Sequence, residues 1–102
     1  MYGTLMRCRL LPGKDRAFEN YGRRMLEEEA VEGFLGEYVL IPDGRSDEVT
    51  VLVLFASEDS YRQNAASPEQ HRRYLELRAL LAADPEWTDG RIEEWRPATI
   101  PI

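Results

Sequence analysis

The segment 49–55 constrains the fold of this chain most strongly, because every residue in it except Thr50 is apolar. Successive side chains of a β-strand point to opposite faces, so this strand presents apolar side chains to both sides of its sheet. A strand of that kind lies inside a sheet rather than at its edge. The pattern predicts a central strand over residues 48–56, with both faces of the sheet in need of cover.

Two other segments have the alternation that is typical of strands. Residues 2–11 form the first, which ends at Pro12 and Gly13. Residues 34–41 form the second, and the strong turn signal of residues 42–45 joins it to the central strand as a hairpin. We expect one face of the second strand to carry Phe34, Gly36, Tyr38 and Leu40.

A last strand is predicted over residues 91–96, following a turn at Asp89 and Gly90. Residues 84–87 are typical of a turn or a single helical turn. Prolines beyond residue 96 predict an irregular tail.

The spacing of apolar residues changes to that of a helix after residue 14. Phe18, Tyr21 and Met25 fall on one helical face, with Gly22 and Leu26 beside them. This pattern predicts a helix between the first two strands.

A second helical region follows the central strand. Ser57 is a suitable N-cap for a helix that starts at residue 58, and Ser67 with Pro68 starts a further helix. Gln70 stands where it would complete a capping box with Ser67. The buried stripe of that helix is expected to consist of Tyr74, Leu77, Leu80 and Leu81.

The predicted order of elements is β-α-β-β-α-β, which is that of the ferredoxin-like α+β fold. In this fold a four-stranded antiparallel sheet carries both helices on one face. The other face would then expose the apolar side chains of residues 49–55, and an exposed apolar face marks an interface. We therefore expect a homodimer, in which two sheets pack together around a two-fold axis. The chain is expected to be one domain over residues 1–102, with a core at 2–96 and a tail at 97–102.

Charge and cysteine content narrow the function. Thirteen basic and nineteen acidic residues give a net charge of −6, which disfavours a nucleic acid or an anionic membrane as partner. Cys8 is the only cysteine, so a thiolate zinc site and an intrachain disulfide are excluded. His71 is the only histidine. No signal peptide or apolar span is visible, and a cytoplasmic location is expected.

Four segments, in their order and spacing, resemble the antibiotic biosynthesis monooxygenase superfamily of dimeric α+β barrels. They are CRLLPGK at residues 8–14, GFLG at 33–36, VLVLFASEDSY at 51–61 and SPEQHRRY at 67–74. The resemblance covers residues 2–96. It implies a homodimer in which each subunit has a ligand cavity between its sheet and its helices.

The resemblance implies a cofactor-independent monooxygenase, with no metal or flavin, that acts on an aromatic or polyketide-like small molecule and O2. In such a reaction the substrate itself supplies the electrons, so the protein needs a dry pocket, a base and anion stabilisation. The alternatives are a non-catalytic ligand-binding or structural dimer and an isomerase or decarboxylase that uses His71 without O2.

Haem degradation, which another branch of the superfamily performs, is disfavoured. That branch uses an Asn on the first strand, a Trp in the helix after the third strand and a His ligand further on. On the best match these positions hold Met6, Asn64 and Tyr74, and none of them agrees.

By this resemblance the candidate catalytic residues are His71, Asn64 and Tyr74. His71 is the candidate base or hydrogen-bond donor, unless it lies at the surface beside the neighbouring arginines. Asn64 is a candidate to orient a substrate carbonyl, and its alternative role is to cap a helix. Tyr74 is otherwise a core tyrosine.

Candidate substrate-binding residues are Tyr38, Thr50 and Arg7, which lie on predicted strands. Tyr38 and Thr50 either line the cavity or point outward. Arg7 either holds an anionic group or pairs with Glu37 or Glu93 on a neighbouring strand. Two further expectations concern packing: Cys8 is a small buried residue rather than a reactive thiol, and Trp95 anchors the core or the dimer.

Overall fold

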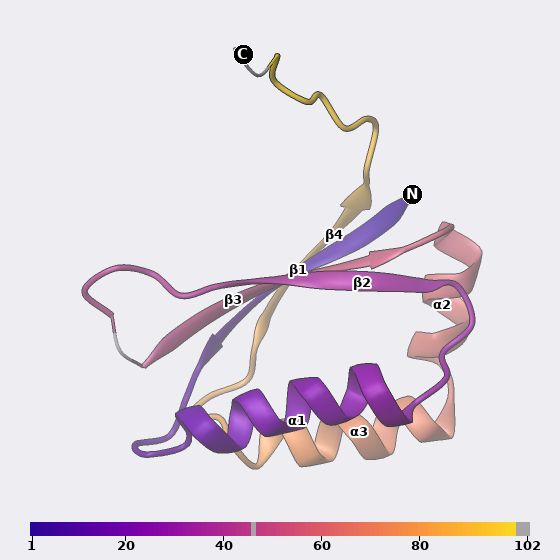
Figure 1. Cartoon of the computed structure of the whole chain (residues 1–102). Coiled ribbons are helices and arrows are strands. Elements are labelled where there is room, and N and C mark those ends of the chain that lie inside the picture. Colours follow the sequence, from indigo (N-terminus) through magenta and orange to yellow (C-terminus); the bar gives the residue numbers. More distant parts are fainter. Residues whose placement is uncertain (46, 100–102) are drawn as a thin grey trace.

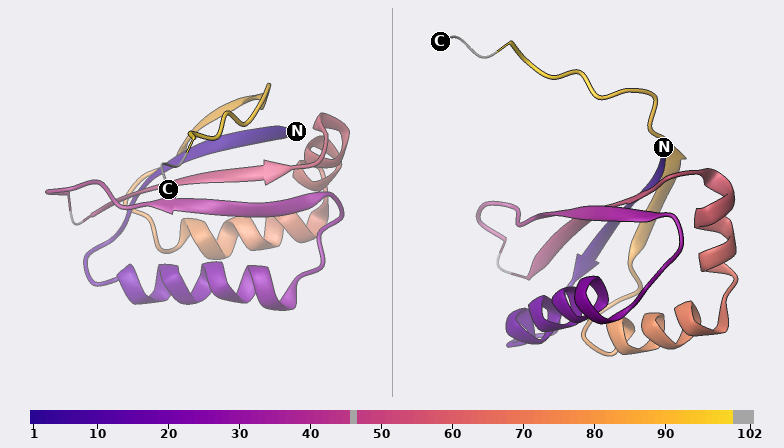
Figure 2. Two further views of the ribbon diagram at one scale, coloured as in Figure 1. Left: turned by 45° about the horizontal axis from the view of Figure 1, so that its top comes forward. Right: turned by 45° about the vertical axis from the view of Figure 1, so that its right-hand side comes forward.

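The computed structural model describes residues 1–45 and 47–99. In chain order its elements are β1 (Tyr2–Arg9), α1 (Asp15–Glu28), β2 (Phe34–Leu40), β3 (Glu48–Phe55), α2 (Glu58–Ala65), α3 (Pro68–Arg78) and β4 (Glu86–Arg91). The strands form one antiparallel sheet in the order β2-β3-β1-β4. Helices α1 and α3 lie side by side across one face, and α2 stands at the end of the sheet (Figure 1, Figure 2). The ferredoxin-like α+β fold is confirmed.

Strand β3 is central, as its apolar composition predicts. It pairs with β1 over its full length, from Glu48 opposite Arg9 to Phe55 opposite Tyr2, and with β2 on its other side. On the face toward the helices, Val49, Val51 and Phe55 are buried. The core cluster consists of Met6, Cys8, Leu10, Val49, Val51, Leu77 and Leu81. The core therefore joins β1 and β3 to α3.

The face assignment predicted for β2 is wrong at its first residue. The register with β3 shifts between Phe34 and Gly36, so Phe34 pairs with Phe55 on the helix-facing side. Beyond the shift, Glu37 lies on that same side, while Tyr38 lies on the other. A β-bulge at this point, where Gly36 has a φ of 141°, adds one residue and reverses the alternation.

The predicted position of the last strand is wrong: β4 spans Glu86–Arg91 rather than residues 91–96, and only Arg91 belongs to both ranges. Its backbone pairs with β1, with Trp87 opposite Met6, Asp89 opposite Thr4 and Gly90 opposite Gly3. Asp89 and Gly90 therefore belong to a strand rather than a turn, because β1 offers them a free edge for hydrogen bonding. Local turn preference is overridden by this long-range pairing.

The helix starts agree with their caps. Ser57 and Ser60 form a reciprocal capping box at the start of α2. Ser67 accepts a hydrogen bond from the backbone of Gln70 at the start of α3. The expected capping box of Ser67 is only half formed, because the Gln70 side chain bonds Asn64 and Arg73 instead.

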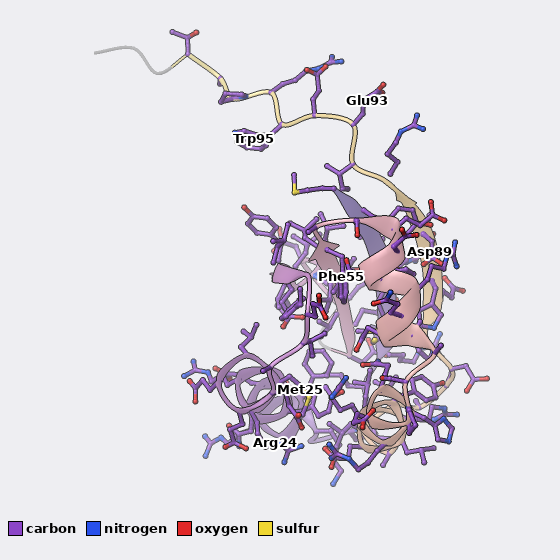
Figure 3. All side chains as sticks on the ribbon, turned by 90° about the vertical axis from the view of Figure 1, so that its right-hand side faces the viewer. Arg24, Met25, Phe55, Asp89, Glu93 and Trp95 are labelled. Carbon is purple, nitrogen blue, oxygen red and sulfur yellow. The ribbon has the colours of Figure 1, made fainter. Side chains whose placement is uncertain are left out.

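The helix-free face of the sheet is apolar in its middle. Its exposed or half-buried side chains come from three neighbouring strands and include Leu5, Tyr38, Leu40, Leu52 and Leu54. We call this set the open face. Residues 92–99 leave β4 and extend away from the helices, and Trp95 on this tail is 78% exposed (Figure 1, Figure 3). In this subunit Trp95 is therefore not a core anchor.

Among the described residues no helix is both long enough and apolar enough to cross a membrane.

Gly33 gives a direct test of how tightly the sheet and α2 are joined. It has a φ of 80°, and a Cβ on it would lie 2.4 Å from the Cβ of Ser60 in the α2 capping box. We expect Gly33→Ala to lower the free energy of unfolding by about 3 kcal/mol, since backbone strain and a steric clash add. Urea denaturation measures this change.

Gly44→Ala is the matched control. Gly44 has a similar φ of 72°, but no atom lies within 4 Å of an added Cβ. Only the backbone strain remains, so the expected loss is about 1 kcal/mol. Equal losses in the two variants would contradict the packing of Gly33 on Ser60.

Candidate functional site

A cavity of about 1130 Å³ lies between the helix-facing side of the sheet and the helices. Its volume is slightly above the usual range of small-molecule sites, roughly 300–1,000 Å³. Its apolar walls come from all the strands and from α1 and α3, and include Met6, Phe18, Met25, Val51, Val53, Phe55 and Leu77. The space is large enough for a polycyclic organic molecule.

Helix α1 forms one wall of the cavity and buries none of its residues completely. Its predicted apolar stripe is present: Phe18, Tyr21, Gly22, Met25 and Leu26 all line the cavity, and Phe18 and Tyr21 also pack against the core cluster. Figure 3 shows Met25 in the space between α1 and α3. The apolar side chains of this amphipathic helix therefore face the cavity as well as the core.

A buried arginine organises the polar part of the cavity. Arg73 on α3 is only 6% exposed. Its Nη2 donates to Asn64 Oδ1 at 2.9 Å and its Nε donates to Gln70 Oε1 at 3.1 Å. Its Nη1 lies 3.5 Å from Glu29 Oε2, which supplies the balancing charge. Because a buried charge without partners is costly, this set of contacts is needed to keep Arg73 in place.

These contacts determine the orientation of Asn64. Arginine only donates hydrogen bonds, so the Asn64 oxygen must face Arg73. The Asn64 amide nitrogen then faces Gln70 Oε1 at 3.3 Å, and one of its two hydrogens remains for another acceptor. The Gln70 oxygen likewise accepts from both Arg73 and Asn64, so the amide hydrogens of Gln70 remain for another acceptor. This end of the cavity is therefore rich in donors and suits an oxygen that carries negative charge.

The three predicted catalytic residues all line this cavity. Asn64, in the last turn of α2, and Tyr74, on α3, are half-buried, while His71 in the first turn of α3 is exposed. The structure thus brings the three side chains to one space. Their catalytic roles remain predictions.

The three predicted substrate-binding residues do not lie in the cavity. Tyr38, 69% exposed, and Thr50 point to the open face, as Arg7 does. Arg7 pairs with Glu86 on β4 at 3.3 Å, not with Glu37 or Glu93. The bulge in β2 accounts for part of this result, because it sends Glu37 to the opposite face.

Cys8 is buried in the core, as expected. Burial raises the pKa of its thiol to about 11, so it is a packing residue rather than a nucleophile. In residues 1–45 and 47–99 no three His, Cys, Asp or Glu side chains gather in a way that could hold a metal ion.

Glu37 is a cavity residue that sequence reasoning placed in a surface ion pair. It projects from β2 under Gly22 of α1, and an added Cβ on Gly22 would lie 3.7 Å from Glu37 Oε1. Burial raises the pKa of this carboxyl group. Nearby Tyr21 donates to the backbone oxygen of Arg73, and burial followed by the Glu76 charge raises its pKa to about 12. A carboxyl of this kind is a candidate proton acceptor.

Arg73 is the other residue that sequence reasoning missed. The predicted buried stripe of α3 has Tyr74 in it, whereas the structure buries Arg73 with Leu77. The available signal is the spacing, since Arg73 precedes Leu77 by four residues and therefore shares its face. Because arginine is charged, it is not expected on the buried face of a helix.

Comparison with known proteins gives one family. The family model described as "Antibiotic biosynthesis monooxygenase" matches residues 1–76. A search of curated protein sequences found no match.

Solved structures share the fold at low sequence identity. A variant of SnoaB, named as a cofactor-independent oxygenase from Streptomyces nogalater, superposes with a TM-score of 0.79 at 17% identity, covering 95% of this chain and 97% of SnoaB. A conserved protein from Methanosarcina mazei gives a TM-score of 0.74 at 21% identity, covering 88% and 90%. Rv0793 from Mycobacterium tuberculosis gives 0.73 at 13%, covering 94% and 98%. These likenesses establish the fold.

The burial of Glu37 predicts a pH-dependent effect on stability. Because burial raises its pKa, the folded chain holds this proton more tightly than the unfolded chain, and ionisation of Glu37 costs stability as pH rises. We expect Glu37→Gln to unfold at a higher temperature than wild type at pH 7. The difference should vanish below about pH 4, where the carboxyl is protonated in both states.

Thermal melts followed by circular dichroism at several pH values measure this difference. Glu32→Gln is the control, since Glu32 is exposed in the turn before β2. An equal response of the two variants would show that Glu37 is as well solvated as a surface carboxylate.

Proposed function

This chain belongs to the antibiotic biosynthesis monooxygenase family, and on that basis we propose that it oxidises an aromatic or polyketide-like small molecule with O2 and without a cofactor. The observation that carries the proposal is the donor cluster of Asn64, Gln70 and Arg73 at the wall of a large apolar cavity. The likeness to SnoaB, which is named as a cofactor-independent oxygenase, supports the same chemistry.

An anthrone illustrates the reaction. A base removes a proton from its CH2 group, and the carbonyl oxygen takes up the negative charge of the resulting enolate. The enolate passes an electron to O2, and the two radicals combine at the same carbon to give a peroxide. Loss of water then leaves a second carbonyl. One oxygen atom enters the product and the other leaves as water, so the substrate provides all the electrons.

Two features of the cavity assist this sequence. The free amide hydrogens of Asn64 and Gln70 stabilise the enolate oxygen, and they act more strongly in an apolar space than in water. The apolar walls keep water from the enolate and the radical pair. Arg73 is a positioning residue here, because it fixes the orientation of both amides.

The proton acceptor is one of two cavity residues. His71 is the residue that the family resemblance suggests; it lines the cavity from the same helix as Arg73, but its side chain is exposed. Glu37 lies deeper, and burial raises the pKa of its carboxyl group, which makes it a better base near neutral pH than a surface carboxylate. Comparison of the two single variants identifies the base.

We further propose that the working unit is a homodimer formed through the open face. Three strands present apolar side chains there, among them Leu40, Leu52 and Leu54, and no helix of the described residues covers them. The tail of residues 92–99 extends on the same side, away from the helices (Figure 2), and offers further apolar surface through Trp95. A second copy with the same face would cover this surface symmetrically.

Oxygen consumption with anthrone as substrate tests the proposed reaction. We expect wild type to consume O2 and Asn64→Ala to lose about 100-fold in kcat/KM, the usual effect of removing one oxyanion donor. Whichever of His71→Ala and Glu37→Gln removes the base should lose a similar factor and the acidic limb of the pH–rate profile.

The exposed residue Asn20 provides the control variant Asn20→Ala, which should keep full activity. Circular dichroism of each variant ensures that activity is compared between folded proteins. No O2 consumption by wild type with anthrone or its hydroxylated derivatives would contradict the oxygenase. Retained binding of these compounds would then favour the non-catalytic ligand-binding alternative.

Sedimentation equilibrium tests the homodimer. Wild type should have the mass of two chains at micromolar concentration, and Leu52→Glu should have that of one, because it places a charge in the centre of the open face. Leu75→Glu, at an exposed position of α3, should remain a dimer. A wild-type mass of one chain would rule the dimer out.

A further inference from the structure

The cavity has a second polar region, which begins with Thr4 on β1. Thr4 is 2% exposed, and its hydroxyl oxygen makes no well-formed hydrogen bond among the described residues, although it lies close enough to the Tyr61 hydroxyl to influence its pKa. It lines the same cavity as Asn64. A buried hydroxyl without a well-formed hydrogen bond is uncommon and costs stability, so a ligand that supplies a better partner would be favoured here.

Asp89 lies beside Thr4. The two residues are paired directly across β4 and β1, and they point to the same helix-facing side. Side chains in such a pair have Cβ atoms about 5 Å apart. Figure 3 shows Asp89 next to α2. A solvent-exposed carboxylate and a buried hydroxyl therefore lie together at the cavity wall.

Tyr61 of α2 completes this region. Its hydroxyl donates to Asp89 Oδ1 at 2.9 Å, and its ring packs against those of Tyr2 and Phe55. Burial and the hydrogen bond to Asp89 raise the pKa of Tyr61 and outweigh the opposing effect of the Thr4 hydroxyl, so Tyr61 stays a neutral donor. Asp89 is thereby held in place with its remaining oxygen available as an acceptor.

The geometry points to a second substrate subsite: we propose that Thr4, Tyr61 and Asp89 bind a neutral hydroxyl group on the substrate. The substrate hydroxyl donates to Asp89 and accepts from Thr4. This inference rests on the proposed function, and it narrows the substrate to a hydroxylated polycyclic aromatic molecule.

The charges of the subsite select that chemical group. The Asp89 carboxylate repels carboxylates and phosphates, and it requires a donor. The nearest cation, Arg62, is exposed and occupied by Glu58 and the Tyr2 hydroxyl. A phenolic or alcoholic hydroxyl both donates and accepts, as this pair of groups demands.

The subsite also gives the substrate a direction. Tyr61 and Asn64 are three residues apart on α2, so they are neighbours on one face of the helix. A hydroxyl held by the Tyr61–Asp89 pair therefore lies about one helical turn from the donor cluster at Asn64. A flat molecule that engages both regions is fixed in one orientation, and this selects which of its carbons reacts.

Binding of three related compounds tests the subsite: anthraquinone, 2-hydroxyanthraquinone and 2-methoxyanthraquinone. The fluorescence of Trp87, which lines the cavity, reports their binding. Below the pKa of the ligand phenol, we expect wild type to bind the hydroxyl compound about tenfold more tightly than the other two, as for one well-formed hydrogen bond. Asp89→Asn keeps an acceptor for Tyr61 and should abolish this preference. Thr4→Val should reduce it about threefold.

Two control variants make the same kinds of substitution at positions outside the subsite. Thr88→Val alters the neighbouring threonine on the other face of β4, and Asp43→Asn alters an exposed carboxylate in the turn after β2. Both should keep the tenfold preference. Absence of a preference in wild type, absence of binding, or an unchanged preference in Asp89→Asn would overturn the subsite.

Oxygen consumption separates this inference from the proposed function. A preference for the hydroxyl compound without any O2 consumption would support the subsite and reject the oxygenase. Oxygenation of anthrone without a preference for the hydroxyl compound would reject the subsite and leave the oxygenase standing.

Discussion

The antiparallel pairing of β1 with β3 is the interaction on which the rest of this structure depends. It aligns Met6 and Cys8 with Val51 and Val49 on one face, and α3 packs on them through Leu77. The same pairing places Leu5 beside Leu52 on the open face. The β1–β3 pair thus contributes residues to the core, to the wall of the cavity and to the surface proposed for dimerisation.

The space under the sheet is divided between core and cavity. The α3 end is filled by Leu77 and Leu81, while α1 has no fully buried residue and its apolar stripe lines the cavity. Close packing throughout would be more stable, since empty apolar volume costs free energy. This loss of stability is consistent with a cavity that binds a ligand, and a bound aromatic ligand would recover part of the lost free energy.

The polar groups in this cavity are held by partners that the fold brings from distant segments. Arg73 takes contacts from the end of α1 through Glu29 and from α2 through Asn64. Burying an ion pair gives little net stability, but removing one partner is costly, so the cluster specifies one arrangement of α1, α2 and α3. The donor groups are therefore rigid before a substrate enters, which is what anion stabilisation requires.

How much of the site the sequence could predict depends on whether the position of each residue follows from a local motif or from long-range strand pairing. Asn64, His71 and Tyr74 are candidates through the family resemblance, whose motifs lie near the α2–α3 junction, and all three line the cavity. Glu37 and Asp89 depend on strand register instead. One bulge in β2 and the early start of β4 changed their positions, and neither leaves a clear local pattern.

By itself, the sequence determined the order of strands and helices, the central position of β3 and the presence of an uncovered apolar face. These properties follow from the alternation of side chains and from caps, which act over a few residues. The tertiary structure alone decided that Arg73 is buried, that Thr4 and Asp89 meet, and that the apolar stripe of α1 lines a cavity. Those outcomes depend on register and on contacts between segments up to 85 residues apart, which local patterns do not encode.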